Sequence, residues 1–197
     1  MRPTGAVPLR LGMAAALVAT AGLSGCRSET ESLPWDSGKH PRIELTSTAF
    51  AEGQPIPQKY TGEGADVSPS LSWSALPQGT KELALICDDP DAPGGTWVHW
   101  VVYKIPVAAT GLPGNAGGAE PRQPELLTMV EGRNSFGNTG YGGPMPPRGG
   151  GEHRYFFRLY ALDAELALEP GLDKPALLKA IEGHILAEGE LMGTYER

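Results

Sequence analysis

The sequence is poor in cysteine and in basic residues, and each scarcity excludes a class of protein. Its 197 residues include 2 Cys, and 16 Lys and Arg stand against 23 Asp and Glu. Nucleic-acid binding requires a basic surface, as does electrostatic attachment to anionic lipids, so this acidic chain suits neither partner. The sequence also lacks an internal repeat, a zinc motif of short regular spacing, and a Ser or Cys in a nucleophile turn. The length fits a single globular domain.

Glycine and proline, in contrast, are abundant: 27 Gly and 19 Pro make up nearly a quarter of the chain. Both residues weaken helix interiors, so this composition disfavours a helical bundle and favours strands joined by shaped loops. Because 40% of the residues are hydrophobic and no Gly-X-Y period occurs, the composition also excludes collagen and wholesale disorder. We therefore expect a mainly β domain.

The first 25 residues have the pattern of an export signal. Arg2 and Arg10 give a positive start, and the apolar run 11–23 is too short to span a bilayer as a mature helix. The run ends in small residues before Cys26, and this arrangement resembles the lipobox of bacterial lipoproteins, in which the Cys becomes the acylated N-terminus. The alternative is an ordinary secretory signal in which the Cys has no role.

The lipobox interpretation predicts three parts: a signal peptide over residues 1–25, a flexible tether over 26–41 and a folded domain over 42–197. The mature chain keeps 14 Lys and Arg against 23 Asp and Glu, a formal charge of −9. Acylation of Cys26 would make the protein a membrane-anchored lipoprotein that faces the periplasm. Arg27 follows the Cys in place of Asp, which favours the outer membrane.

Several segments are rich in alternating, β-branched or aromatic residues, as strands are. They are residues 42–46, 82–87, 97–105 and 153–162. Near the end, Asp173 can cap a helix, and apolar residues recur after it at helical spacing. These are Leu177, Leu178, Ile181, Ile185 and Leu186. The sequence therefore predicts an antiparallel two-sheet β-sandwich with a C-terminal helix that covers one edge of the sheets. Cys87 is expected to be a buried thiol without a disulfide.

Polar residues gather near the ends of the predicted strands. Residues 88–93 follow one strand, residues 97–100 open the next, and a Gly-rich loop over 134–147 leads into His153. Adjacent strands would bring the histidines of the last two segments to one rim of the sheet. Asp89 would then lie beside them, at the end of the neighbouring strand.

The periodicity of a strand also assigns each histidine a face. On an extended strand, His99 shares a face with Val101 and Tyr103, while His153 shares one with Tyr155 and Phe157.

The sequence resembles the phosphatidylethanolamine-binding protein family, also called Raf kinase inhibitor-like proteins, in its bacterial branch. The resemblance runs from about Ile43 to the C-terminus and rests on four motifs in the family's order. They are Ser68-Pro69-Ser70-Leu71-Ser72-Trp73, Asp-Pro-Asp-Ala-Pro at 89–93, His99-Trp100, and the stretch from Gly-Tyr-Gly-Gly-Pro at 140–144 to His-Arg-Tyr at 153–155. It implies a large antiparallel sheet packed on a smaller one. It also implies a small pocket at one end for phosphate-like groups, including phospholipid headgroups.

Carried over by motif, the resemblance implies seven residues that line this pocket. They are Asp89, His99, Tyr141, Gly143, Pro146, His153 and Tyr155. Physical chemistry suggests their roles: Asp89 orients a histidine, because a carboxylate repels an anion, and the tyrosines donate their hydroxyls. Consecutive N–H groups at Gly142 and Gly143 can form an anion-binding concavity. Met145 stands where relatives carry Gly or Cys, so we expect its bulk to reshape the mouth.

Three functions stay open at the level of sequence. We favour a lipid-anchored protein that binds a small anionic or phosphorylated ligand, without a cofactor or enzymatic activity. The second is a metal-dependent hydrolase that uses the aspartates and histidines to activate water. The third is a regulator or inhibitor of an unidentified protein partner. Structural roles are also open for Asp91 as a turn former, His99 as a core histidine and Arg154 in an ion pair.

Overall fold

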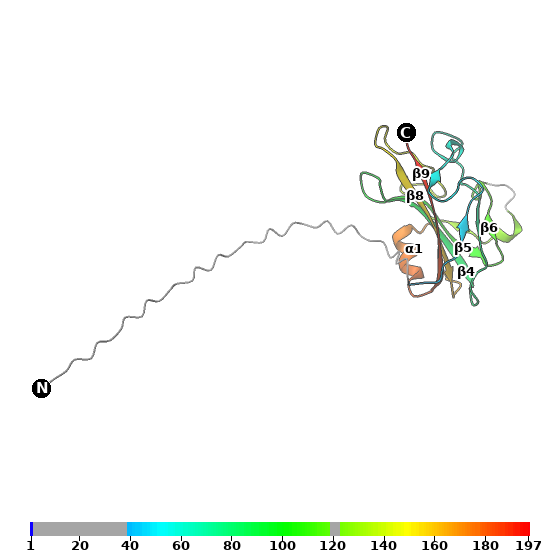
Figure 1. The fold of residues 1–197 in the computed structure, drawn as a ribbon. Helices are drawn as coiled ribbons and strands as arrows, with labels where there is room; N and C mark the ends of the chain where they lie inside the picture. Colours follow the sequence, from blue (N-terminus) through cyan, green and yellow to red (C-terminus); the bar gives the residue numbers. More distant parts are fainter. Residues whose placement is uncertain (2–38, 119–122) are drawn as a thin grey trace. The chain divides into compact units, whose positions relative to one another are not determined.

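The computed structural model describes Met1 and residues 39–118 and 123–197, and Figure 1 shows its fold. Nine strands lie in the described residues: β1 Leu45–Thr46, β2 Gln54–Pro55, β3 Leu71–Trp73, β4 Glu82–Asp89, β5 Trp97–Pro106, β6 Gly111–Leu112, β7 Val130–Glu131, β8 His153–Leu162 and β9 Ile185–Tyr195. The helices are α1 Lys174–Ile181 and two short 3-10 turns, η1 Gln58–Tyr60 and η2 Pro124–Leu126. Cys26, nearly all of the expected signal peptide over 1–25 and most of the tether over 26–41 lie outside the described residues.

The strands form two sheets, which confirms the mainly β, two-sheet fold predicted from the sequence. The larger sheet has the order β2-β9-β8-β4-β5-β7, and the smaller one has the order β1-β3-β6. The long neighbours β9, β8, β4 and β5 are antiparallel, whereas the short edge strand β2 runs parallel to β9. A large apolar core forms from both sheets, with Leu85, Trp100 and Phe157 from the larger and Leu71 and Leu112 from the smaller.

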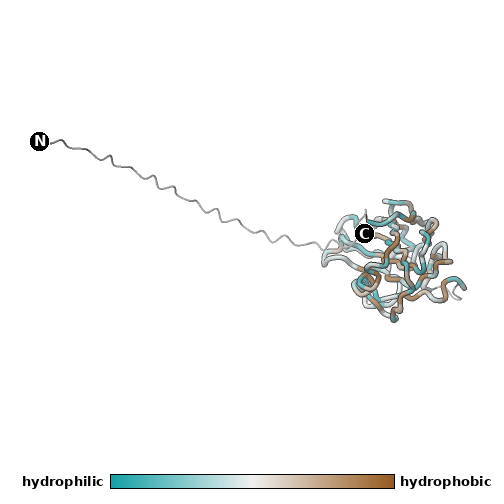
Figure 2. The backbone as a smooth tube through the Cα atoms, turned by 90° about the horizontal axis from the view of Figure 1, so that it is seen from below, coloured by the Kyte–Doolittle hydropathy of each residue, from teal (hydrophilic) through white to brown (hydrophobic). Residues whose placement is uncertain are grey.

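The helix α1 lies on the other face of the larger sheet. Leu177 and Ile181 are fully buried there and form a second core with residues of β4, β5 and β8. Because both faces are covered, β4 is buried along its whole length, and hydrophobic stretches of this kind are brown in Figure 2. Cys87, within β4, is a buried free thiol, as predicted, and burial raises its pKa. The helix thus covers a face of the sheet, and the expected edge position is wrong.

The predicted helix is also too long, because the chain turns into a strand before Ile185. α1 ends at Ile181, Gly183 adopts a φ of +82°, and the remaining chain forms the eleven-residue strand β9. This strand was missed because its glycines weaken the β signal. The structure explains one of them: a Cβ at Gly189 would lie 2.8 Å from the backbone oxygen of Ile43. Within the described residues, no helix is long and apolar enough to span a membrane.

Candidate functional site

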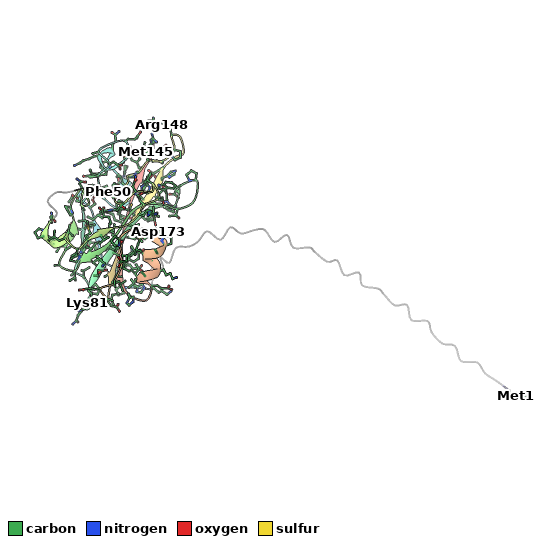
Figure 3. All side chains as sticks on the ribbon, turned by 180° about the vertical axis from the view of Figure 1, so that it is seen from behind. Met1, Phe50, Lys81, Met145, Arg148 and Asp173 are labelled. Atoms are coloured by element: carbon green, nitrogen blue, oxygen red, sulfur yellow. The ribbon has the colours of Figure 1, made fainter. Side chains whose placement is uncertain are left out.

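A cavity lies where three strands of the larger sheet end or begin. β4 ends at Asp89, which pairs with Trp97 at the start of β5, and the neighbouring β8 begins at His153. The cavity has a volume of about 250 Å³. It is lined by Asp89, Ala92, Pro93, Gly94, Trp97, His99, Phe136, Met145, Pro146, Pro147, His153 and Tyr155. Met145 lies at one end of the domain, opposite Lys81 (Figure 3).

Asp89 and His153 form a buried pair in the wall of this cavity. His153 Nδ1 donates a hydrogen bond of 2.8 Å to Asp89 Oδ2, and both residues are less than 5% exposed. The other carboxylate oxygen accepts the Asp91 backbone N–H at 2.8 Å. Both oxygens are therefore occupied, and the carboxylate fixes the imidazole with its proton on Nδ1. Nε2 is the ring nitrogen that is left to contact a ligand.

His99 reaches the cavity through a β-bulge. Cys87 pairs with Trp100 and Asp88 pairs with Val98, so His99 is the extra residue between two regular pairs. Its ring packs edge-on against Tyr155 with centroids 5.1 Å apart, on the side of the large core. Strand periodicity had placed His99 with Val101 and Tyr103, which face α1 instead. That prediction is wrong because the bulge turns the side chain to the opposite face.

The protonation of His99 is set by its surroundings. Nδ1 donates a 2.6 Å hydrogen bond to the Gly142 carbonyl, so Nε2 is again the remaining ring nitrogen. Burial lowers the pKa of His99, against the opposing effects of the Gly142 carbonyl and of the negative charge on Asp89. Burial therefore favours the neutral ring, whereas a bound anion would favour its protonated form.

Tyr155 contributes a hydroxyl that has no hydrogen-bond partner of good geometry among the described residues, although the Asp89 carboxylate lies close enough to act on it. The side chain is 1% exposed and lines the cavity, and its Oη is buried. Burial, reinforced by the negative charge of Asp89, raises the pKa of Tyr155 far above its usual value. The phenol thus keeps its proton and can donate to a ligand. Buried hydroxyls without partners are rare, and here a ligand atom would satisfy the group.

The Gly-rich loop does not supply the expected anion-binding N–H groups. The Gly142 N–H donates to the His99 carbonyl at 2.9 Å, and the Gly143 N–H donates to Asp66 Oδ1 at 2.6 Å. The Tyr141 hydroxyl donates to the Tyr60 carbonyl at 2.8 Å. The structure does not bring Tyr141 or Gly143 to the cavity wall. The predicted N–H concavity is therefore wrong, because neighbouring loops already use these donors.

An apolar rim surrounds the polar residues, and sequence reasoning overlooked part of it. Trp97, Phe136 and Met145 are 38%, 42% and 42% exposed, and all three line the cavity. Trp97 and Phe136 pack edge-on with centroids 5.4 Å apart. Pro146 lies beside them, as the family resemblance implies. Phe136 was missed as a lining residue, although it lies within the Gly-rich loop over 134–147 that the sequence singles out.

Asp91 serves the structure around the cavity and does not line it. Its carboxylate accepts three hydrogen bonds from Arg154, at the backbone N–H, Nε and a terminal nitrogen. The Arg154 side chain pairs closely with Asp91, which lowers the pKa of that carboxyl. This is the ion pair expected as one role of Arg154.

Across the described residues, no three His, Cys, Asp or Glu side chains form a group that could hold a metal ion.

Comparison with known proteins decides the family. The sequence profile described as "Phosphatidylethanolamine-binding protein" matches residues 46–196, most of the chain. The chain belongs to the phosphatidylethanolamine-binding protein family. The resemblance inferred from its motifs is therefore confirmed.

Proteins that are similar to this chain occur in both archaea and bacteria. A "UPF0098 protein" of Methanothermobacter thermautotrophicus is 50% identical over 155 residues, which are 79% of this chain and 99% of the relative. Among solved structures, a putative phosphatidylethanolamine-binding protein homologue of Chlamydia trachomatis is 43% identical, with a TM-score of 0.70. YbcL of E. coli, a member of the same family, is 32% identical, with a TM-score of 0.71. The two matches cover 79% of this chain and 98% and 99% of those chains.

Proposed function

We propose that this member of the family binds a small phosphorylated or otherwise anionic ligand in the cavity. One observation carries the proposal. Two imidazoles and one phenol converge on a single cavity, and both Nδ1 atoms already donate to fixed acceptors. The Nε2 atoms and the Tyr155 hydroxyl are thus the polar groups left for a ligand. A protonated imidazole and a phenol are hydrogen-bond donors, which suits the oxygens of a phosphate ester or a phospholipid headgroup.

The negative charge of Asp89 does not oppose this role, because the residue acts behind a histidine. Its two oxygens are occupied by His153 and by the backbone of Asp91. The carboxylate therefore orients the His153 imidazole, so that Nε2 can face the ligand, and does not contact the anion itself. A ligand with a single small anionic group satisfies the geometry, since the remaining walls are largely apolar.

Titration calorimetry with inorganic phosphate tests the proposal. We expect binding by the unmodified protein, and about a 10- to 100-fold loss of affinity in His99→Ala and in His153→Ala, because each removes a hydrogen bond to a charged group. Tyr155→Phe should also weaken binding without lowering stability, since the lost hydroxyl has no partner in the described protein. His184→Ala is the matched control, because it removes a histidine that pairs with Asp163 and does not line the cavity. No detectable binding of phosphate by the unmodified protein would contradict the proposal.

The affinity should also depend on pH in a defined direction. Burial lowers the pKa of His99, so binding of an anion is expected to be coupled to the uptake of a proton. Sulfate keeps its charge over this range. Its affinity is expected to rise by up to about tenfold per pH unit as the pH falls from about 8 towards 6. Titrations at several pH values measure this slope. An equal slope in His99→Ala would show that another group takes up the proton.

We also propose that the protein is exported and anchored through acylated Cys26, facing the periplasm from the outer membrane. The support is the sequence pattern over residues 1–27, with its positive start, apolar run and small residues before the Cys. Cys26→Ala is expected to abolish incorporation of labelled palmitate and to move the protein from the membrane fraction to the soluble fraction. Retention of label in this variant would exclude Cys26 as the acylated residue.

A further inference from the structure

Three segments that are far apart in sequence meet behind one wall of the cavity. The wall consists of Met145, Pro146 and Pro147, which belong to the Gly-rich loop. From behind, the Gly62 N–H donates to the Pro144 carbonyl at 3.0 Å. The end of the chain contributes Arg197, whose terminal nitrogen donates to the Pro146 carbonyl at 3.3 Å.

The same loop is also held by the backbone of the last residue. The Gly149 N–H donates to the Arg197 carbonyl at 3.1 Å. Met145 packs closely on Gly62, because a Cβ at Gly62 would lie 3.1 Å from the Met145 sulfur. Figure 3 shows Met145 and Arg148 together at this end of the domain. The wall is thus held between the segment around Gly62 and the end of the chain.

The carboxylate of Glu63 joins these segments. Its Oε2 accepts the Tyr195 hydroxyl at 2.8 Å, and its Oε1 lies 3.1 Å from Arg197 Nε and 3.2 Å from an Arg148 terminal nitrogen. The side chains of Glu63 and Arg197 are 22% and 16% exposed, whereas that of Arg148 is 76% exposed. The ion pair with Arg197 is therefore the better shielded of the two.

We propose that Glu63 is a positioning residue that sets the cavity wall, and hence the ligand affinity, through Arg197 and Arg148. Glu63 does not line the cavity itself. It fixes the guanidinium of Arg197, and that guanidinium fixes the carbonyl of Pro146, whose ring is part of the wall. Arg148, in the same loop, gives a second attachment. This proposal rests on the proposed function, because its main readout is the affinity of the cavity.

The consequence for binding is preorganisation. Pro144, Pro146 and Pro147 stiffen the loop, so attachment at a few points holds the whole wall in place. Without the Glu63 carboxylate, the wall would have to be ordered when the ligand binds. Such ordering costs affinity, although no contact to the ligand has been removed.

The test compares Glu63→Gln with Glu152→Gln, which removes the same charge from an exposed position at the end of the same loop. Calorimetry with inorganic phosphate should show about a 2- to 10-fold loss of affinity in the first variant and none in the second. Nuclear magnetic resonance of labelled methionine methyls gives a readout without ligand. The Met145 signal is expected to shift in Glu63→Gln and to stay in place in Glu152→Gln.

Arg148→Gln provides a second variant if Glu63→Gln does not fold, with a smaller effect in the same direction. An unchanged Met145 signal in folded Glu63→Gln and Arg148→Gln would overturn the inference. A loss of affinity in Glu152→Gln equal to that in Glu63→Gln would also overturn it. If the unmodified protein binds no phosphate, the proposed function fails. The methyl signal still decides whether Glu63 holds the wall.

Discussion

Asp88→Asn is expected to lower the free energy of unfolding by about 3 to 5 kcal/mol. Asp88 is fully buried on the α1 side of β4, where Arg158 donates to its Oδ1 at 2.6 Å and Lys174 Nζ contacts its Oδ2. Both cations are themselves less than 10% exposed. Asparagine keeps the size of the side chain but removes the negative charge that compensates them. Breaking such a group by removing one partner leaves buried charge poorly compensated, which is strongly destabilising.

Urea denaturation followed by circular dichroism measures this change. Asp163→Asn is the matched control, because it removes an aspartate whose ion pair with His184 is largely exposed. A loss below about 1 kcal/mol is expected there. Equal losses in the two variants would show that the buried position of Asp88 has no special weight. Arg158 also contacts Glu190 at 3.0 Å, so part of its charge stays compensated in Asp88→Asn.

Trp100→Ala is expected to lower the free energy of unfolding by about 3 to 5 kcal/mol for a different reason. Trp100 is fully buried in the core between the sheets, next to His99, and its ring packs edge-on against Tyr141 at 5.7 Å. Truncation would leave an unfilled space in the core and remove the ring that packs against Tyr141. The same denaturation experiment measures the loss.

Trp100→Phe separates packing from hydrogen bonding at this position. It keeps an aromatic ring but removes the indole N–H, which donates to Glu131 Oε1 at 2.7 Å. We expect a loss of about 1 to 3 kcal/mol, since the lost bond is to a charged group. If Trp100→Ala were no more destabilising than Trp100→Phe, packing of the indole would not be what matters.

The strands could be predicted where local pattern determines them. β8 has the bounds expected from its aromatic and β-branched residues, and β5 and β4 extend the predicted segments by one and two residues. The cap of α1 was also visible, and the Asp173 side chain accepts the Ala176 N–H at 3.0 Å. β9 could not be recognised, because its glycines are explained only by neighbours that pack against them. Gly189, for example, faces Ile43, which lies far away in sequence.

The same distinction holds for the site: contacts that follow from strand pairing could be predicted, whereas contacts between loops could not. Asp89 and His153 could be grouped because both lie at strand ends that adjacent strands bring together, and they form a hydrogen bond. The use of the Gly143 N–H could not be foreseen, because its acceptor, Asp66, is 77 residues away. The same applies to the contact between Glu63 and Tyr195, which are 132 residues apart. Contacts between loops leave no periodic signal in the sequence.

The bulge at His99 sets the regularity of strand β5 against the position of a cavity-lining histidine. With regular pairing, Asp88 would face His99, and the imidazole would turn towards α1, where Val101 and Tyr103 already pack. Deleting the extra residue would thus straighten β5 and remove a histidine from the cavity in one step. If the cavity requires this bulge, relatives that keep the cavity are expected to carry the same extra residue at this position of the strand.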